Sequence, residues 1–301
     1  MADQATIRGL ISGAFDTHVH TSPDVLARKT TDAELARRAL DHGMAGFVVK
    51  SHFSSTVDRA TVLREAFPGL QAYGGIVLNH VIGGLNPVAV DIAGRLGGKV
   101  VWLPTVDAAN ERGTFEGHHV ETRLPYWISI ARDLRDRGIS GDWIEVVNDD
   151  GKVHPRARQC LELIAHHDMV LATGHIAPRE MLPIVRAARE AGVRRVIITH
   201  PEFPSTHLTI DEQKALLAYD VYFERCVLQP LTGKVEWSEV IRNVQEVGVS
   251  STILATDLGQ ITNPYADEGL ATFIDRLLDA GLRESDISAM VSSHAFDCLG
   301  I

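Results

Sequence analysis

The chain has 301 residues, of which 45% are hydrophobic and 23% are charged, so it can bury a sizeable core and lacks the composition of a disordered protein. Its formal net charge is −10 and it contains no basic run, which argues against a nucleic-acid partner. No stretch of about 18 apolar residues is present, and the opening residues lack the basic and apolar regions of a signal peptide, so we expect neither a membrane span nor secretion.

Short apolar runs alternate with amphipathic segments along the chain. The runs predict eight strands, at residues 13–20, 45–52, 70–78, 99–104, 169–173, 195–199, 221–224 and 252–256. The amphipathic segments predict helices at residues 31–43, 57–67, 86–96, 155–166, 211–218, 235–247, 267–280 and 284–298, with another that begins at Pro178. Thr31 and Glu34 have the spacing of a capping box at the start of the first of these helices.

Several predicted strands are apolar on both faces, which is typical of parallel strands that are buried on both sides. Strand–helix units of this number most simply close into a (β/α)₈ TIM barrel, so we predict an α/β fold with one domain over residues 1–301. An open doubly wound sheet is the alternative, but no GxGxxG motif follows the first strand. Residues 107–151 interrupt the alternation, and we interpret them as a long insertion after strand four that forms a lid, with some helix at 125–137 and a turn at 148–151.

His18 and His20 form an HxH pair at the end of the first predicted strand. Residues two apart on a strand point to the same side, so both imidazoles can reach one metal ion. The pair alone says little, because a chain with 14 histidines is expected to contain such a pair by chance.

Residues at the ends of the other predicted strands support the interpretation of the HxH pair as part of a metal site. In a barrel these ends converge on one mouth, where active sites are built, and neutral imidazoles and carboxylates are ligands of Zn²⁺, Mn²⁺ and Fe²⁺. Taken singly, a histidine after a strand is as easily a structural hydrogen-bonding group as a ligand. The potential ligands are Lys50, followed by His52, at the second strand, Asn79 and His80 after the third, His175 after the fifth, His200 after the sixth and Asp257 after the eighth.

The motifs FDTHVH, TGH, ITH and ATD at strands one, five, six and eight resemble those of the amidohydrolase superfamily. The resemblance implies one or two divalent metal ions in the barrel mouth, zinc first, with manganese or iron as alternatives. It implies that His18, His20 and Asp257 bind the more buried metal. It also implies that His175 and His200 bind a second metal, or that one of them binds the first metal while the other polarises the substrate. Asp257 would be the catalytic base that handles the proton of the attacking water.

The end of strand four departs from the family pattern. Two-metal members usually carry a carboxylated lysine or a glutamate there, whereas this strand reads KVVWLP and has no such group at its end. We expect Lys50 to be the substitute, as a carbamate ligand, because a bare ammonium is costly to bury. The alternatives are that Lys50 binds a substrate carboxylate or pairs with Asp257, and that the site holds a single metal.

These expectations indicate a metal-dependent hydrolase that cleaves an amide, lactam, lactone or ester bond with a metal-activated water. The alternatives are a mononuclear decarboxylase of the amidohydrolase type, a phosphoesterase, and a metal-free binding protein that kept the barrel. Arginine suits carboxylate or phosphate recognition, which favours a small anionic substrate. The substrate-binding candidates are Asn79, His80, Arg112, His118 and Arg225. The alternative is that the loops that carry them are only solvated.

The cysteines of the chain suggest where the protein works. Cys160, Cys226 and Cys298 are far apart in sequence and form no CxxC pair, which is typical of reduced thiols in a cytoplasmic protein. We therefore expect a cytoplasmic enzyme whose partner is a small molecule. The apolar helix faces could also pack between subunits, so a homo-oligomer is possible.

Overall fold

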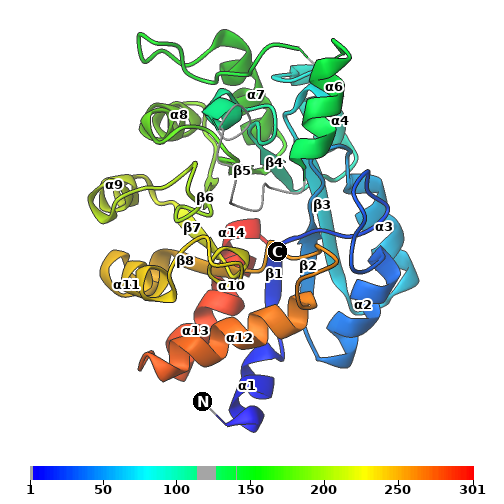
Figure 1. Ribbon diagram of the computed structural model, residues 1–301, viewed down its shortest axis with the longest axis vertical. Helices are drawn as coiled ribbons and strands as arrows, with labels where there is room; N and C mark the ends of the chain where they lie inside the picture. Colours follow the sequence, from blue (N-terminus) through cyan, green and yellow to red (C-terminus); the bar gives the residue numbers. More distant parts are fainter. Residues whose placement is uncertain (1–2, 114–126, 140) are drawn as a thin grey trace.

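The computed structural model describes residues 3–113, 127–139 and 141–301. Eight parallel strands form one sheet in the order β1 to β8, each paired with the next along the chain. Figure 1 shows the strands following one another around a common centre, with helices outside them. The strands are β1 (Phe15–Val19), β2 (Gly46–Val49), β3 (Gln71–Val77), β4 (Val100–Trp102), β5 (Val170–Ala172), β6 (Arg195–Thr199), β7 (Tyr222–Cys226) and β8 (Thr252–Ala255).

The first and last strands meet through a few bonds, so the barrel is nearly closed. The amide of Asp257 donates to the carbonyl of His18 at 2.7 Å, and the amide of His20 donates to the carbonyl of Leu258 at 2.8 Å. The predicted α/β barrel is therefore confirmed, and each predicted strand is present. Strand β7 runs two residues farther than predicted, which places Glu224 inside the strand instead of at its end.

Helices separate the strands, and several begin where the sequence predicted. Thr31 and Glu34 form the expected capping box, and the side chain of Asn86 caps α4. The α-helices are α1 (Gln4–Ile11), α2 (Asp32–Asp41), α3 (Val57–Ala66), α4 (Pro87–Arg95), α6 (Ile128–Asp136), α7 (Pro155–His166), α8 (Pro178–Glu190), α9 (Ile210–Leu216), α10 (Leu228–Leu231), α11 (Trp237–Val247), α12 (Ala266–Asp279), α13 (Glu284–Val291) and α14 (Ser293–Leu299). The 3₁₀ helices are η1 (His80–Ile82), η2 (Ala109–Glu111), η3 (Leu217–Tyr219) and η4 (Val249–Ser251).

The last predicted helix, at residues 284–298, is two helices in the structure. It breaks at Ser292, whose hydroxyl donates to the carbonyl of Gly13 at 3.0 Å. The break turns α14 across the N-terminal end of the barrel, where Phe296 packs edge-on against Phe15 with ring centroids 5.6 Å apart. The break lets the apolar side chains of α14 pack against the barrel interior, and burying this apolar surface stabilises the fold more than an unbroken helix would. Helix α14 thereby closes the end of the barrel opposite the strand-end ligands.

The segment between β4 and β5 carries η2, α6 and α7, so the helix expected at residues 125–137 is present as α6. Residues 114–126 and 140 lie outside the described part of the chain. The lid role of residues 107–151 therefore stays a prediction.

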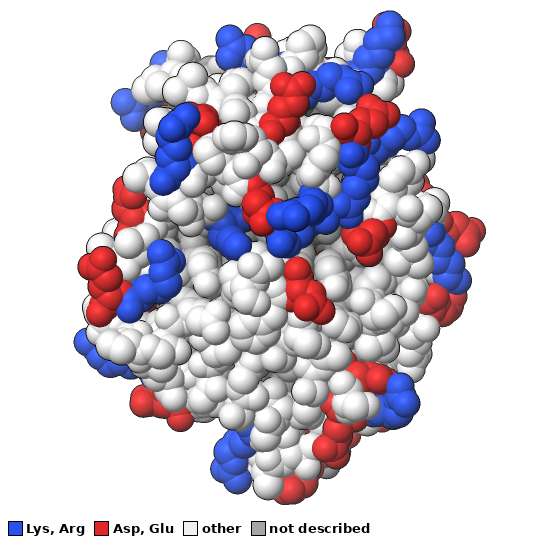
Figure 2. Space-filling view, turned by 180° about the vertical axis from the view of Figure 1, so that it is seen from behind, with Lys and Arg blue, Asp and Glu red and all other residues white. Residues whose placement is uncertain are grey.

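The surface and the cysteines complete the description. On the face opposite that of Figure 1, acidic and basic side chains are intermixed, so neither charge covers it (Figure 2). No helix in the described ranges is long and apolar enough to cross a membrane. All three cysteines are buried and form no disulfide.

Candidate metal centre

Five histidine side chains lie together at the C-terminal ends of the strands. They are His18 on β1, His20 after β1, His52 after β2, His175 after β5 and His200 after β6. Neighbouring ring centroids are 5.4 Å apart for 18 and 20, 5.1 Å for 20 and 52, 6.0 Å for 52 and 175, 5.0 Å for 175 and 200, and 6.1 Å for 200 and 18. The rings thus form a closed histidine circle at the mouth of the barrel, which is where barrel enzymes build their sites.

Asp257 brings a carboxylate to this circle. Its Oδ1 atom lies 3.2 Å from Nε2 of His18 and 3.1 Å from Nε2 of His20. One ligand atom from each of these three residues lies within 4.8 Å of the other two, a spacing that a single metal ion can bridge. Two imidazole nitrogens and a carboxylate oxygen form a donor set that suits Zn²⁺. The residues therefore fit the metal that the sequence predicted.

The backbone at two of these strand ends is strained. His200 has a φ of 30° and Asp257 a φ of 54°, in the left-handed region that residues with a side chain rarely adopt. Such strain is typical of functional sites. At the end of β5, Gly174 has a φ of 61°, and a Cβ there would lie 2.3 Å from the carbonyl oxygen of Leu103. Only glycine therefore allows the TGH turn that presents His175.

Carboxylates stand behind two of the histidines. Oε2 of Glu224 lies 2.9 Å from Nδ1 of His18, and Oε1 of Glu111 lies 2.9 Å from Nδ1 of His175. A carboxylate accepts hydrogen bonds, so it favours the tautomer that carries its proton on Nδ1 and leaves the Nε2 lone pair for a metal. Both carboxylates are fully buried, and the Thr17 hydroxyl donates to Glu224 at 2.6 Å.

Charged and amide groups surround the remaining ligands. Arg28, which pairs with Asp24, has its Nη2 atom 3.4 Å from Nδ1 of His20. The amide of Gln229 donates to Oδ2 of Asp257 at 3.3 Å, while its own oxygen is buried and has no hydrogen-bond partner among the described residues. That oxygen adds a free acceptor beside the carboxylate.

Lys50 reaches the centre of the circle. Its Nζ atom lies 3.1 Å from Nε2 of His18 and its side chain is buried. Burial lowers the pKa of Lys50, although the negative charges of Asp257 and Glu224 oppose the shift. The amine therefore lies beside the nitrogen that a metal ion would use.

The protonation states also suit metal binding. Burial lowers the pKa of His20, His52 and His200 well below the usual value, so these imidazoles are neutral at pH 7. Burial raises the pKa of Asp257, but the charge of His18 and the hydrogen bonds of His18 and His20 outweigh it and hold that pKa well below its usual range. Neutral imidazoles beside an ionised carboxylate are the forms that bind metal ions.

The structure places the predicted substrate-binding residues differently from the predicted ligands. Asn79 is buried at the mouth, where it hydrogen-bonds Thr105. His80 is half-buried with its Nε2 atom 2.6 Å from the carbonyl of Asp142, and it lines a separate hollow with Trp143.

The arginine candidates lie outside the circle. Arg225 is buried between β7 and the outer helices, where it pairs with Glu202 and donates to Gln213 at 3.0 Å. Arg112 is exposed on the segment after β4, and His118 lies outside the described residues. Neither Arg225 nor Arg112 therefore contacts the histidine circle in the described part of the chain.

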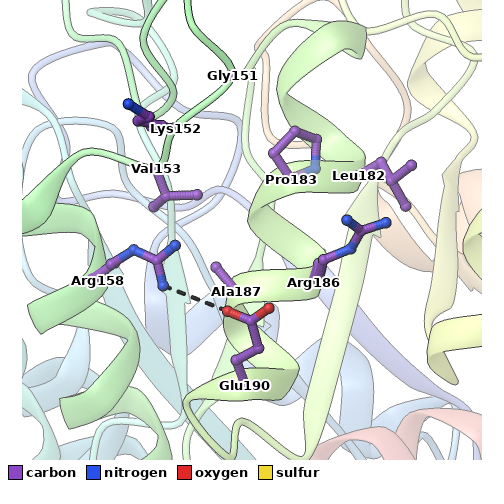
Figure 3. A pocket seen from close by; sticks show the side chains of 9 residues that line it. All are labelled: Gly151, Lys152, Val153, Arg158, Leu182, Pro183, Arg186, Ala187 and Glu190. Carbon is purple, nitrogen blue, oxygen red and sulfur yellow. Dashed lines mark ion pairs between the residues drawn. The ribbon is translucent and has the colours of Figure 1, made fainter.

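A surface pocket of about 280 Å³ also lies away from the circle, between α7 and α8. Figure 3 shows Arg158 and Glu190 facing each other across it, 3.5 Å apart. The pocket has no histidine in its lining, so it does not belong to the metal centre.

Four contributors to the site were not predicted as site residues: Glu224, Glu111, Arg28 and Gln229. The signal for Glu224 is its position inside a buried strand, where a charge is costly unless it has a partner. Glu111 ends the short 3₁₀ helix η2 and Arg28 lies on a loop, and nothing in their local sequence distinguishes them from solvated charges.

Comparisons with known proteins agree with this geometry at the level of the fold. An amidohydrolase from Pseudomonas aeruginosa is similar in structure, with a TM-score of 0.64 at 11% identity over 99% of this chain and 98% of that one. An amidohydrolase from Burkholderia multivorans with bound zinc has a TM-score of 0.57 at 11% identity, over 96% and 99%. The 2,6-dihydroxybenzoate decarboxylase from Rhizobium has a TM-score of 0.53 at 11% identity, over 96% and 99%.

The barrel predicted from the alternation of strands and helices is thus a fold that the chain shares with these solved structures. Among curated proteins, none matches the sequence significantly. A family model does match residues 13–224, a span that contains all five histidines of the circle and Glu224 but stops before β8. The chain therefore belongs to the family of unknown function DUF6282.

Proposed function

We propose that the protein is a metal-dependent hydrolase that cleaves an amide, lactam, lactone or ester bond of a small substrate. The observation that carries the proposal is the meeting of His18, His20 and Asp257 within 4.8 Å at the barrel mouth. These three residues would hold a zinc ion, and His175 and His200 lie across the circle, where they would bind a second metal or the substrate. A zinc ion bound there lowers the pKa of a coordinated water to about 7 and supplies hydroxide at neutral pH.

Asp257 is suited to the role of base. Its side chain is 13% exposed, whereas those of His18 and His20 are 0% and 2% exposed, so it is the member of this trio that solvent reaches best. It accepts the proton of the attacking water and returns it to the leaving group. The Gln229 amide that donates to its Oδ2 atom holds the carboxylate in orientation.

Lys50 is the proposed bridging residue in place of the missing group at the end of β4. Its Nζ atom lies 3.1 Å from Nε2 of His18, and a carbamate on that nitrogen would bring two oxygens to the same place. The carbamate would also replace a buried cation by an anion among residues that bind cations, which lowers the cost of burial.

A negatively charged substrate is supported by the surroundings of Lys234. Its Nζ atom lies 4.9 Å from the centroid of the Phe203 ring, and this ring lies 5.1 Å from His200 and 5.7 Å from His175. Within the described ranges Lys234 forms no ion pair, and its side chain is exposed. Its charge is therefore available to a carboxylate at the rim of the circle.

The first experiment is elemental analysis of the freshly purified protein and of Lys50→Ala. About two metal equivalents per chain in the wild type, with fewer in the variant, would support a bridged two-metal hydrolase. Hydrolysis of a panel of lactones, amides and esters, lost on chelation and restored by zinc, completes the test. A protein without bound metal that hydrolyses nothing after zinc loading would refute the proposal.

A mononuclear decarboxylase is the second candidate. Within the described residues two trios are spaced for a single ion, and the one formed by His18, Glu224 and Cys226 shares His18 with the one built on Asp257. In addition, β4 ends without a charged group. One metal equivalent that is unchanged in Lys50→Ala, with release of CO₂ from aromatic or dienoic carboxylates and no ester hydrolysis, would favour this candidate.

A further inference from the structure

His52 is a member of the histidine circle whose environment differs from that of the others. Its ring stacks on His20 with centroids 5.1 Å apart and meets His175 edge-on at 6.0 Å. Its Nδ1 atom lies 2.8 Å from the hydroxyl oxygen of Thr105. Its Nε2 atom has no hydrogen bond within the described part of the chain and is not among the fully enclosed polar atoms, so it faces the open mouth.

The orientation of the Asn79 amide fixes the hydrogen bonds around Thr105. The backbone amide of Thr105 donates at 2.8 Å, so the Asn79 atom that receives it is the oxygen. The Asn79 nitrogen then donates to the backbone carbonyl of His52 at 3.0 Å and to the hydroxyl of Thr105 at 2.8 Å. The reverse orientation of the amide would set donor against donor and acceptor against acceptor.

The hydroxyl of Thr105 therefore already accepts one hydrogen bond, and its own hydrogen needs an acceptor. Nδ1 of His52 is the acceptor that the structure provides, because Thr105 is fully buried and has no other acceptor among the described residues. If Nδ1 carried the proton instead, the buried hydroxyl would be left without an acceptor, which is unfavourable. The proton of the neutral His52 ring thus belongs on Nε2.

This tautomer is the opposite of the one expected for the ligands. His18 and His175 face carboxylates through Nδ1, so they carry the proton there and present a lone pair at Nε2. His52 presents an N–H at Nε2 and cannot bind a metal ion through that atom. It offers the mouth a hydrogen-bond donor on a rigid, buried ring.

We propose that His52 is a catalytic residue that donates a hydrogen bond from Nε2 to the substrate oxygen that gains negative charge in the reaction. No proton is transferred in this role. A fixed donor aimed at a developing oxyanion in a site that excludes water is an effective form of catalysis. This inference rests on the proposed hydrolytic function for its substrate oxygen, but the tautomer itself does not depend on that function.

The tautomer can be measured directly. Two-bond ¹H–¹⁵N correlation spectra of the histidine-labelled protein distinguish a protonated Nε2 from a protonated Nδ1, with His52→Gln used to assign the signal. We expect the proton on Nε2 in the metal-free and in the zinc-loaded protein. Thr105→Val should lose this preference and Thr105→Ser should keep it. A proton on Nδ1 of the wild type, or a zinc-induced shift that marks Nε2 as a ligand, would overturn the proposal.

A binding measurement tests the role of the donor. Inorganic phosphate serves as an oxyanion probe of the zinc-loaded protein, with zinc content measured in parallel. His52→Leu should bind phosphate about tenfold to a hundredfold more weakly at unchanged zinc content, and His52→Gln, which keeps a donor, should lie between. Equal phosphate affinity in all three proteins, or the loss of a zinc equivalent in His52→Leu, would contradict the proposal. A wild type that binds no zinc would instead refute the hydrolase, and the tautomer of the metal-free protein would still decide the inference.

Discussion

Oε2 of Glu224 on β7 lies 2.9 Å from Nδ1 of His18 on β1, so a buried carboxylate reaches past β8 to hold the first histidine of the HxH pair. The two residues are separated by 206 positions in the chain. The carboxylate fixes both the direction of the ring and the nitrogen that carries the proton. It therefore leaves Nε2 of His18 free for the metal ion that we propose this histidine binds.

Replacing Glu224 with glutamine tests this relationship. The amide keeps the size of the side chain but can present a donor to Nδ1, so we expect zinc affinity to fall about tenfold to a hundredfold. Competition with a chromophoric chelator measures the affinity. The control is Glu239→Gln, which alters a half-buried carboxylate 2.9 Å from His207, away from the histidine circle, and should leave zinc affinity unchanged. Equal zinc affinities in the two variants would show that Glu224 does not support metal binding.

His18→Ala and Asp257→Asn should each abolish turnover and most zinc binding while the fold is retained. The reason is that both side chains lie at strand ends, where they serve the mouth and not the apolar core. Circular dichroism and metal analysis measure the two effects. The control is His42→Ala, which removes an exposed histidine at the end of α2. A variant of either residue that kept near-normal rates would show that the site has been misassigned.

Lys234→Gln should raise the KM of a carboxylate-bearing substrate about fivefold to tenfold and leave kcat nearly unchanged. The charge at the rim attracts the substrate equally in the ground state and the transition state, so it affects binding more than chemistry. A neutral ester with the same reacting bond provides the comparison. Lys214→Gln, on α9 and 4.0 Å from Glu246, is the control variant. The same KM change for the neutral ester would contradict the charge-recognition role.

The pair formed by Arg225 and Glu202 should support the fold and not the substrate. Both side chains are buried outside the barrel, so Glu202→Gln leaves an uncompensated guanidinium and should destabilise the protein by about 3–5 kcal/mol. Denaturant unfolding gives this free energy. Zinc content measured on the folded fraction should match the wild type. Loss of zinc without loss of stability would instead connect the pair to the metal centre.

The sequence by itself determined the barrel and the positions of most candidate ligands. Strand periodicity, capping boxes and the polar residues that end apolar runs are local features, so Thr31, His18, His175 and Asp257 could be placed from the order of residues alone. A repeated strand–helix unit then leaves few topologies, and the carboxyl ends of its strands must meet.

Only the tertiary structure decided what stands behind those ligands. Glu224, Glu111 and Thr105 reach His18, His175 and His52 from other strands and loops, and the pairing of distant segments leaves no mark in the local sequence. The prediction that Arg225 binds the substrate was wrong for the same reason, because its partner Glu202 lies elsewhere in the chain. Neighbouring residues of a strand point to opposite sides, so Glu224 faces the barrel interior and Arg225 faces the helices, and the partner on each side fixes the role of each charge.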